Sequence, residues 1–445
     1  MRRIKIAFAA TLLVPAVLWL LADSLLPQPF TYFTFRHVFM QFSGVLLMVL
    51  MSVAMLLALR PKWLEPHLDG LDKMYRLHKW LGIAALAAGL VHWWWGKFTK
   101  WMVGWGWLVK TPGSGMGRGR DPGELESWLR AQRALAETLG EWGFYAAVIL
   151  IILALVKRFP YHLFVSTHKL LAATYLIFVY HSLILTELAY WSQPVGWLLA
   201  VMLLAGTWAA IMTLLGKIGA RRTVHGHIES KIYYPSLQVL ETSIALQPGW
   251  PGHQAGQFAF VRSQPGERAH PYTIASSWQA DKPQICFVVK ELGDHTAKLS
   301  RILQVGTPVT VEGPYGCFDF ADDKKRQIWV GAGIGITPFI ARMKQLAAHP
   351  DGRQIDLFHP TGSHNRLALE KLQQDAATAG VRLHLLVGDQ DGLLNGARIR
   401  ELVPEWSSAS IWFCGPASFG QSLRSDFIGH GLAARDFHQE LFQMR

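Results

Sequence analysis

Four histidines stand in two apolar segments of the chain at nearly equal spacings. His78 and His92 are 14 residues apart, and His168 and His181 are 13 residues apart. At about 1.5 Å per residue, each pair covers about 20 Å along a helix. Ionisable residues in apolar spans are costly and point to function. Because two imidazoles can hold one iron from opposite sides, we predict two haems, one held by His78 with His168 and one by His92 with His181.

The two spacings differ in helical phase. At about 100° per residue, 14 residues return to within roughly 40° of the starting face, whereas 13 residues miss it by roughly 140°. The helix with His168 and His181 must therefore bend, contain a π-bulge, or present its two histidines to different neighbours. The matched pairs argue against four merely structural histidines and against a haem-free proton transporter.

Six segments are long and apolar enough for a bilayer core, which needs about 20 residues per helix. They cover residues 6–26, 38–59, 77–95, 142–156, 163–186 and 195–215. Lysine and arginine cluster near one set of span ends, which predicts both termini and the second half of the chain in the cytosol. The connection 96–141 then lies outside, although it also carries basic residues. Its amphipathic part, 124–139, is predicted to form a short helix lying over the outer face.

Composition separates the chain into an apolar half and a soluble half. Residues 1–216 hold the long apolar runs, whereas residues 217–445 read as an ordinary α/β sequence. The net charge of +12 comes without a basic helix or an aromatic stacking motif, so it argues for a membrane protein rather than a nucleic-acid binder. Cys286, Cys317 and Cys414 have no paired spacing, which argues against a disulfide framework or an iron–sulfur cluster.

Short β-like runs between residues 223 and 320 predict a small antiparallel barrel. The runs cover 225–233, 236–245, 257–261, 285–290 and 308–312. The motif His270-Pro271-Tyr272-Thr273 offers an aromatic face beside a hydroxyl, which suits a flavin ring. The motif Gly293-Asp294-His295-Thr296 opens a predicted helix at 297–303, whose free N–H groups could bind a pyrophosphate.

From residue 327 onward the pattern alternates strands and helices. A predicted strand at 327–330 leads through Gly331, Gly333 and Gly335 to a helix at 339–348. Ile336 occupies the third glycine position of a dinucleotide fingerprint, but the turn still lets phosphate approach backbone N–H groups. Later strands are predicted at 355–358, 382–386 and 411–414. The last ends in Cys414-Gly415-Pro416, at the carboxyl edge where open α/β sheets bind ligands.

Together these motifs resemble the ferric reductase and NADPH oxidase superfamily over nearly the whole chain, and the soluble half is similar to ferredoxin–NADP reductases. The resemblance implies three domains: a six-helix all-α membrane bundle that binds haem (1–216), an FAD-binding antiparallel β-barrel (217–322) and an NAD(P)-binding α/β domain (323–445). His270 stands where soluble relatives usually have arginine, which favours the transmembrane branch of the family.

The resemblance also implies ligand contacts residue by residue. For FAD they are His270, Pro271, Tyr272, Thr273, Lys290, Gly293, Asp294, His295 and Thr296. For NADPH or NADH they are Gly331, Gly333, Gly335, Thr337, Pro338, Cys414, Gly415 and Pro416. Phe442 would cover the flavin, although three residues follow it, and Phe442, Cys414 and Thr273 would adjoin the reacting atoms. The stretch 359–363 lacks the arginine that often reads the NADPH 2′-phosphate; Arg366 is the alternative, so the choice of nucleotide stays open.

The expected activity is that of a transmembrane oxidoreductase in a bacterial plasma membrane. Electrons would pass from cytosolic NAD(P)H through FAD and two haems to an acceptor on the outer face. Dioxygen, giving superoxide, is the favoured acceptor. A ferric chelate is one alternative. Another is a role as electron-input subunit for a periplasmic redox protein. The expected partners are thus the lipid bilayer and a small-molecule acceptor, with no nucleic acid.

Overall fold

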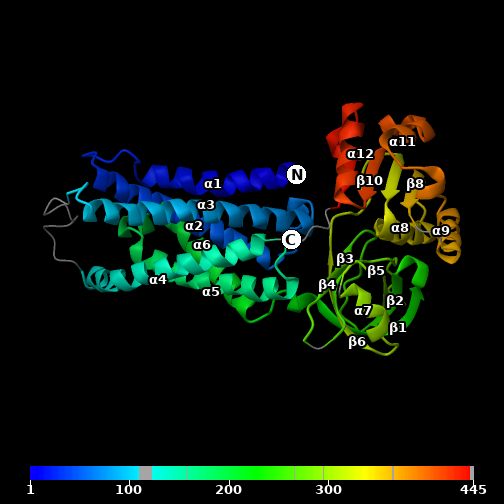
Figure 1. Cartoon of the computed structure of the whole chain (residues 1–445), viewed down its shortest axis with the longest axis horizontal. Coiled ribbons are helices and arrows are strands. Elements are labelled where there is room, and N and C mark those ends of the chain that lie inside the picture. The colour runs from blue at the N-terminus through cyan, green and yellow to red at the C-terminus, as the bar shows by residue number, and fades with distance from the viewer. Residues whose placement is uncertain (110–122, 157, 265, 294, 363–364, 441–445) are drawn as a thin grey trace. The chain divides into compact units, whose positions relative to one another are not determined.

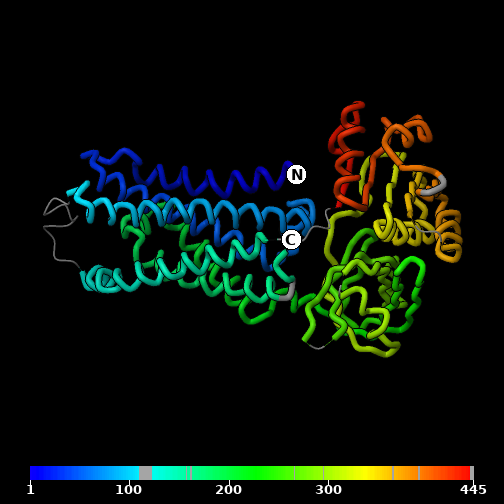
Figure 2. The backbone as a smooth tube through the Cα atoms, in the orientation of Figure 1, coloured from blue at the N-terminus to red at the C-terminus, as the bar shows by residue number. Residues whose placement is uncertain are grey.

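The computed structural model describes residues 1–109, 123–156, 158–264, 266–293, 295–362 and 365–440 of the 445-residue chain. The chain divides into two compact units. One consists of Met1–Leu68 and Lys73–Ile218, and the other begins at Gly219 and includes Asp69–Asp72. The first unit is helical and the second contains both sheets, as the tube in Figure 2 traces from the N-terminus onward. Each unit is described below by itself.

The first unit is built from long helices that run alongside one another (Figure 1). Their bounds are α1 (Arg2–Ala22), α2 (Tyr32–Ala58), α3 (Leu71–Gly104), α4 (Glu124–Leu155), α5 (Tyr161–Leu185) and α6 (Pro194–Leu214). Among the described residues, five helices are long and apolar enough to cross a membrane: α1, α2, α4, α5 from Leu163, and α6. The predicted third span is helical, but α3 carries charged residues near both ends and is not among the five, so its crossing stays a prediction.

The predicted short helix over the outer face is wrong. Residues 124–139 are the first half of α4, which runs without interruption from Glu124 to Leu155. Its amphipathic half is tied to α3 by ion pairs, Lys97 with Glu141 at 2.5 Å and Lys100 with Glu137 at 3.8 Å. Through these ion pairs the polar face of α4 contacts α3. The segment 124–139 therefore continues α4 and does not form a separate helix over the outer face.

The core of the helical unit lies among α1, α2, α5 and α6. Trp19, Met48 and Tyr175 are buried there. The hydroxyl of Tyr175 bonds Ser52 Oγ at 2.8 Å, and a Cβ at Gly206 would come within 2.0 Å of the same hydroxyl. A small residue at 206 therefore lets α5 and α6 approach closely. In contrast, α3 has no comparably close helix partner among the described residues.

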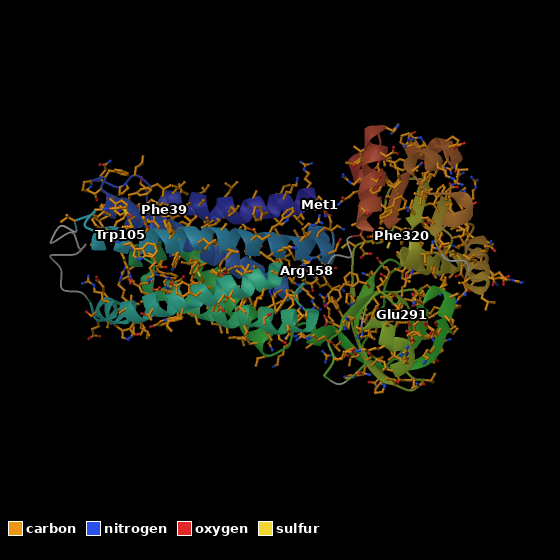
Figure 3. All side chains as sticks on the ribbon, viewed as in Figure 1. Met1, Phe39, Trp105, Arg158, Glu291 and Phe320 are labelled. Atoms are coloured by element: carbon orange, nitrogen blue, oxygen red, sulfur yellow. The ribbon has the colours of Figure 1, made fainter. Side chains whose placement is uncertain are left out.

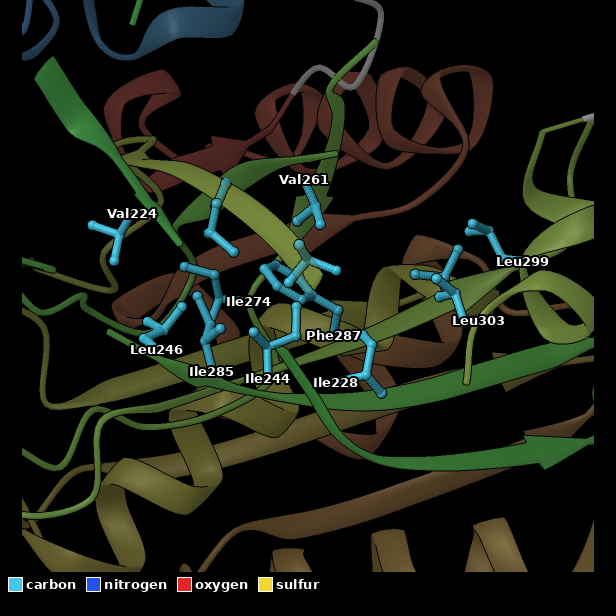
Figure 4. Packing of buried hydrophobic residues seen from close by; sticks show 14 of the residues in the cluster. Val224, Ile228, Ile244, Leu246, Val261, Ile274, Ile285, Phe287, Leu299 and Leu303 are labelled. Carbon is cyan, nitrogen blue, oxygen red and sulfur yellow. The ribbon is translucent and has the colours of Figure 1, made fainter. Parts of the chain in front are cut away.

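The second unit begins with an antiparallel sheet in the order β4-β3-β6-β1-β2-β5. Its strands are β1 (Thr223–Tyr234), β2 (Val239–Leu246), β3 (Phe258–Arg262), β4 (His270–Thr273), β5 (Gln284–Lys290) and β6 (Pro308–Tyr315). An isolated bridge between Ile274 and Phe287 joins the β4 and β5 edges. Buried Ile228, Ile244 and Phe287 belong to its core (Figure 4). The antiparallel sheet agrees with the prediction, and the helix expected at 297–303 is α7 (Thr296–Ile302).

A parallel sheet follows, in the order β11-β10-β7-β8-β9. Its strands are β7 (Arg326–Gly331), β8 (Gln354–Thr361), β9 (Arg382–Val387), β10 (Ser410–Cys414) and β11 (Phe437–Gln439), and its helices are α8 (Thr337–Ala348), α9 (Arg366–Thr378), α10 (Gly388–Asp391), α11 (Gly396–Leu402) and α12 (Ala417–Gly429). The chain continues from β7 to β8 on one side, while β10 pairs on the other side. This reversal of direction makes the carboxyl ends of β7 and β10 a switch point, where ligands of such sheets bind.

Candidate functional site

His78 and His168, the pair that we propose for the inner haem, are brought together by α3 and α5. The ring centroids of His78 and His168 are 5.8 Å apart, and the ring planes meet at 66°. With metal–nitrogen bonds of about 2 Å on each side, this spacing suits two imidazoles that share one ion. The ring of His168 also stacks on Phe164 at 5.1 Å.

The outer pair lies at His92 on α3 and His181 on α5. His181 is within electrostatic range of His92. Aromatic side chains surround this end of the bundle, including Phe39, which is labelled in Figure 3 and lies 5.1 Å from Trp95. The structure thus brings His78 and His168 side by side and places His181 within electrostatic range of His92.

Three of the four histidines have their Nδ1 atoms engaged by the protein. His78 donates to Ala54 O, and His181 donates to Ala136 O, each at 2.8 Å. His92 Nδ1 lies 2.8 Å from Ser43 Oγ, whose own hydrogen goes to Phe39 O, so Ser43 accepts. With Nδ1 protonated, Nε2 keeps its lone pair for a metal, as in other metal-binding histidines. The donor set therefore fits iron at both levels.

The structure excludes one of the three alternatives for helix phase. Helix α5 is an uninterrupted α-helix, so a π-bulge is not what aligns its histidines. The ring of His168 lies beside that of His78 of α3, and the Nδ1 atom of His181 is held by Ala136 O of α4. On α3 the 14-residue spacing turns both histidines toward α2. There, Ala54 O accepts from His78 Nδ1, and Ser43 Oγ accepts from His92 Nδ1.

Gly140 of α4 makes room for His181. A Cβ at position 140 would lie 2.1 Å from His181 Nδ1, far inside any real contact. No feature of the sequence indicated Gly140, Ser43 or Ala136, because their roles depend on which helices are neighbours. The only available signal for Gly140 is its presence inside a long helix, where glycine costs about 1 kcal/mol relative to alanine.

The predicted flavin motif forms β4, an edge strand paired with β3. Tyr272 lies opposite Ala259, and Thr273 lies opposite Phe258. Burial raises the pKa of the Tyr272 phenol, and the nearby Glu267 carboxylate adds to this. Lys290 ends β5, opposite Val239. All four residues of the motif are partly exposed and could contact a ligand.

The second flavin motif meets the first through side chains. The rings of His270 and His295 stack with centroids 3.7 Å apart and planes within 10°. His295 also contacts Glu267 and Tyr272. The Thr296 hydroxyl accepts from the N–H groups of Leu292 and Gly293, at 2.9 and 3.1 Å, so these two groups already have a partner. Asp294 lies outside the described residues.

The nucleotide motifs meet at the switch point of the parallel sheet. Cys414 and Gly331 are opposite each other at the ends of β10 and β7, and Ala332 N donates to Cys414 O at 3.0 Å. A Cβ at Gly335 would lie 2.2 Å from Cys414 O, so only glycine allows this approach of the two loops. Gly333 has a φ of +56° and open space around it, which leaves its backbone accessible.

Five further residues complete the nucleotide loops. Thr337 Oγ1 donates to Ile334 O at 2.8 Å, and Pro338 follows in the first turn of α8. Gly415, with a φ of +158°, precedes Pro416 at the start of α12. The sequence did not indicate His359 as a site residue. Its Nδ1 donates a hydrogen bond to Gly331 O at 2.6 Å. Its position at the end of β8 was the available signal.

The buried Cys414 is a neutral thiol. Burial and the charge of Glu440 raise its pKa well above the ordinary value. It can therefore line a nicotinamide site but cannot act as a thiolate at neutral pH. Arg366 is 84% exposed in its side chain and pairs with Glu370 at 2.6 Å, so it is open to solvent at the start of α9. Phe442 lies outside the described residues.

Comparison with known proteins identifies two regions. Residues 43–179 match the family model of a ferric reductase like transmembrane component, and residues 229–319 match that of an FAD-binding domain. A flavohemoprotein of Xylella fastidiosa is 28% identical over 219 residues, 45% of this chain and 55% of that protein. Respiratory burst oxidase homolog protein E of Arabidopsis thaliana is 25% identical over 228 residues, 44% of this chain and 23% of that protein. The chain thus spans about half or less of these relatives.

Solved structures align with the chain less closely. The flavohemoglobin from Malassezia yamatoensis, solved with bound FAD and heme, aligns with a TM-score of 0.45 and 19% identity, covering 69% of this chain and 85% of that one. A ferredoxin NADP+ reductase from Neisseria gonorrhoeae aligns with a TM-score of 0.40 and 17% identity, covering 49% and 98%.

Proposed function

Because the chain belongs to the ferric reductase and NADPH oxidase superfamily, we propose that it is an oxidoreductase that moves electrons from NAD(P)H, through FAD and two haems, across a membrane. The observation that carries this proposal is the arrangement of four histidines in two pairs, three of them with a fixed Nδ1 partner. Such second contacts are typical of metal-ligating imidazoles, because they fix the tautomer and the orientation of the ring.

Each pair has a defined task in this proposal. His78 and His168 hold the inner haem, and His92 and His181 hold the outer one; haem iron supplies one-electron transfer when bound. If His92 and His181 both hold the outer haem, they would leave no position there for an acceptor to bind, so the pair would support electron transfer only. The histidines thus restrict the reaction to electron transfer.

The second unit supplies the electrons. The β4 motif from His270 to Thr273, together with Lys290 and the 293–296 turn, holds FAD, and Phe442 covers it. The loops of Gly331, Gly333 and Gly335 hold the nucleotide, with Thr337, Pro338 and Cys414 to Pro416 beside the nicotinamide. Arg366, free in solvent, is our candidate for reading a 2′-phosphate.

The finer features of the proposal rest on the apolar segments, on the basic residues near their ends and on the family resemblance. We propose six spans including α3, both termini in the cytosol of a bacterial plasma membrane, and the domain boundaries 1–216, 217–322 and 323–445. Dioxygen is the acceptor that we favour, giving superoxide. A ferric chelate is the alternative, and an electron-input role for a periplasmic redox protein is a second.

A haem count tests the histidine pairs. Purified protein should bind two b-type haems per chain, measured from the dithionite-reduced spectrum. His92→Leu should reduce this to one and abolish outward electron flow, while flavin reduction by NAD(P)H continues. The matched control is His37→Leu, because His37 also lies on a helix of the first unit, on α2, but pairs with Glu187 at 2.9 Å. Two haems in the His92→Leu protein would refute the assignment.

The acceptor requires a separate assay. Protein in lipid nanodiscs would be given NADPH or NADH, with either cytochrome c or a ferric chelate outside. Cytochrome c reduction that superoxide dismutase abolishes indicates an oxidase, whereas chelate reduction insensitive to dismutase indicates a ferric reductase. Failure of both reactions in a protein with two haems and bound FAD would favour a protein partner.

A further inference from the structure

Four polar side chains come together beside β4. Glu267 lies in the loop before the strand, His270 and Tyr272 are on the strand, and His295 comes from the turn before α7. His295 Nδ1 lies 2.7 Å from Glu267 Oε1, and His295 Nε2 lies 3.1 Å from the Tyr272 hydroxyl. His295 therefore uses both ring nitrogens, one toward a carboxylate and one toward a phenol.

While His295 is neutral, only one arrangement of hydrogens satisfies the hydrogen bonds that join Glu267, His295 and Tyr272. An ionised carboxylate can only accept, so His295 Nδ1 must donate to Glu267. The other oxygen of Glu267 accepts from Ser263 Oγ at 2.9 Å, which holds the carboxylate in place. Nε2 is then an acceptor, so Tyr272 must donate its hydroxyl hydrogen inward to it. The phenol oxygen is left with lone pairs on its outer side.

The surroundings of His295 favour its neutral form. Burial is the largest influence and lowers its pKa, Glu267 raises it, and Lys298 of α7 lowers it. Burial and then the neighbouring His295 lower the pKa of His270, which stacks on the same ring. Tyr272 is the remaining titratable neighbour, and its raised pKa keeps it a phenol. The neutral form of His295 is therefore present above its ordinary pKa of about 6.5 and is lost as the pH falls below the lowered value.

A metal site fits the same residues less well. Ligand atoms of Glu267, His270 and His295 lie within 4.8 Å of one another. However, both nitrogens of His295 have partners already, and its ring is parallel to that of His270 at 3.7 Å. Two parallel stacked imidazoles do not direct their lone pairs to one tetrahedral ion.

We propose that Glu267 and His295 are positioning residues for the flavin site: Glu267 sets the tautomer of His295, and neutral His295 turns the Tyr272 hydroxyl inward so that its oxygen meets FAD as an acceptor. This inference rests on the proposed function, in which Tyr272 contacts FAD. FAD binding then requires neutral His295, so affinity falls as the pH falls. The opposite sign is expected if His295 instead acts as a cation beside the FAD pyrophosphate, because protonation would then tighten binding.

Two substitutions at one position separate the contacts of His295. The amide of glutamine reaches the place of Nε2, so His295→Gln keeps an acceptor for Tyr272 but cannot be protonated. The amide of asparagine reaches the place of Nδ1, so His295→Asn keeps the contact with Glu267 and leaves the partly buried Tyr272 hydroxyl without its partner His295. Loss of such a bond is expected to weaken FAD binding about tenfold.

The experiment measures FAD dissociation constants of the full chain in nanodiscs by flavin fluorescence, from pH 5 to pH 8. We expect wild-type affinity to decrease toward pH 5, His295→Gln to bind within about twofold of wild type at pH 8 and show no pH dependence, and His295→Asn to bind about tenfold more weakly. Tyr272→Phe added to His295→Asn should cause no further loss, because His295→Asn has already removed the oriented acceptor that Tyr272 offers to FAD.

Other outcomes overturn the inference. Tighter FAD binding at pH 5 would make His295 a cation for the pyrophosphate, and equal affinities for His295→Asn and His295→Gln would remove its positioning role. Zinc binding by the flavin-free protein, lost in His295→Asn and in Glu267→Gln, would make the cluster a metal site. If the wild-type protein binds no FAD at any pH, the proposed function itself fails, which is distinct from these results.

Discussion

At the scale of single residues, the atoms beside each ligand decide its chemistry. Ser43 gives its hydrogen to Phe39 O and accepts from His92, so the imidazole is held in one tautomer and one orientation. His168 differs, because its buried Nδ1 has no hydrogen-bond partner among the described residues. The two histidine pairs are therefore unequal in their surroundings, although all four side chains are of one type.

The Ser43 hydroxyl can be removed without changing the shape of α2. In Ser43→Ala, His92 loses its acceptor and becomes a weaker donor to iron, so the ferric state is less stabilised. We expect the midpoint potential of one haem to rise by roughly tens of millivolts while the other stays constant. Potentiometric titration of the Soret band measures both. Ser52→Ala is the matched control, because Ser52 bonds Tyr175 instead; a shift of both haems, or of neither, contradicts the assignment.

At the scale of elements, close helix packing positions the ligands. Gly140 and Gly44 both face histidines, but with very different room. A Cβ would lie 2.1 Å from His181 Nδ1 at position 140, and 3.7 Å from His92 Cε1 at position 44. The first contact is impossible without movement of the histidine or of α4, and the second is ordinary van der Waals distance.

These two glycines form a matched pair for mutation. Gly140→Ala should displace His181 and lower the haem content from two per chain toward one, measured by the reduced spectrum. Gly44→Ala should retain both haems, because its methyl group fits and alanine favours helix by about 1 kcal/mol. Full haem content in Gly140→Ala would mean that α4 lies farther from α5 than described.

At the scale of the whole molecule, the two units should respond differently to acid. His253 is buried in the second unit, where Nε2 lies 3.1 Å from Ser276 O. Burial lowers its pKa to about 4. Since the unfolded chain titrates near 6.5, neutral His253 contributes stability above pH 6.5 that is lost as the pH falls toward 4, in total roughly 3 kcal/mol.

Thermal unfolding from pH 7 to pH 4 checks this expectation. Flavin release should report the second unit, and its midpoint should fall with pH more steeply than in the His253→Gln protein, which cannot gain the proton. Loss of the Soret band should report the first unit and be insensitive to this substitution. A parallel decline in wild type and His253→Gln would show that other groups control acid unfolding.

Much of the architecture could be predicted because it follows from local patterns. Apolar runs gave the helices of the first unit, and the 14-residue spacing gave two histidines on one face of α3. The continuation of α4 through residues 124–139 could not be predicted, since it depends on Glu137 and Glu141 meeting lysines of α3. Ser236 was expected in a strand but lies in the turn Pro235–Leu237, where β2 has not yet begun.

The candidate site shows the same division. Histidines, glycine turns and the Tyr272-Thr273 motif are visible as residue types at fixed spacings. Their partners Ala54, Ala136 and His359 are visible only in three dimensions, because two of them act through main-chain carbonyls that carry no sequence signal and the third through contact with a neighbouring strand.

Gly140 has a consequence for the history of such chains. A single base change can turn a glycine codon into one for alanine, and elsewhere in a long helix that change is favoured. Here the methyl group would collide with a ligand. Descendants of this chain that keep the outer haem should therefore keep glycine at this position, whereas those that have lost His181 are released from it. Glycine at this position in a related sequence would therefore indicate a chain that keeps the proposed second haem.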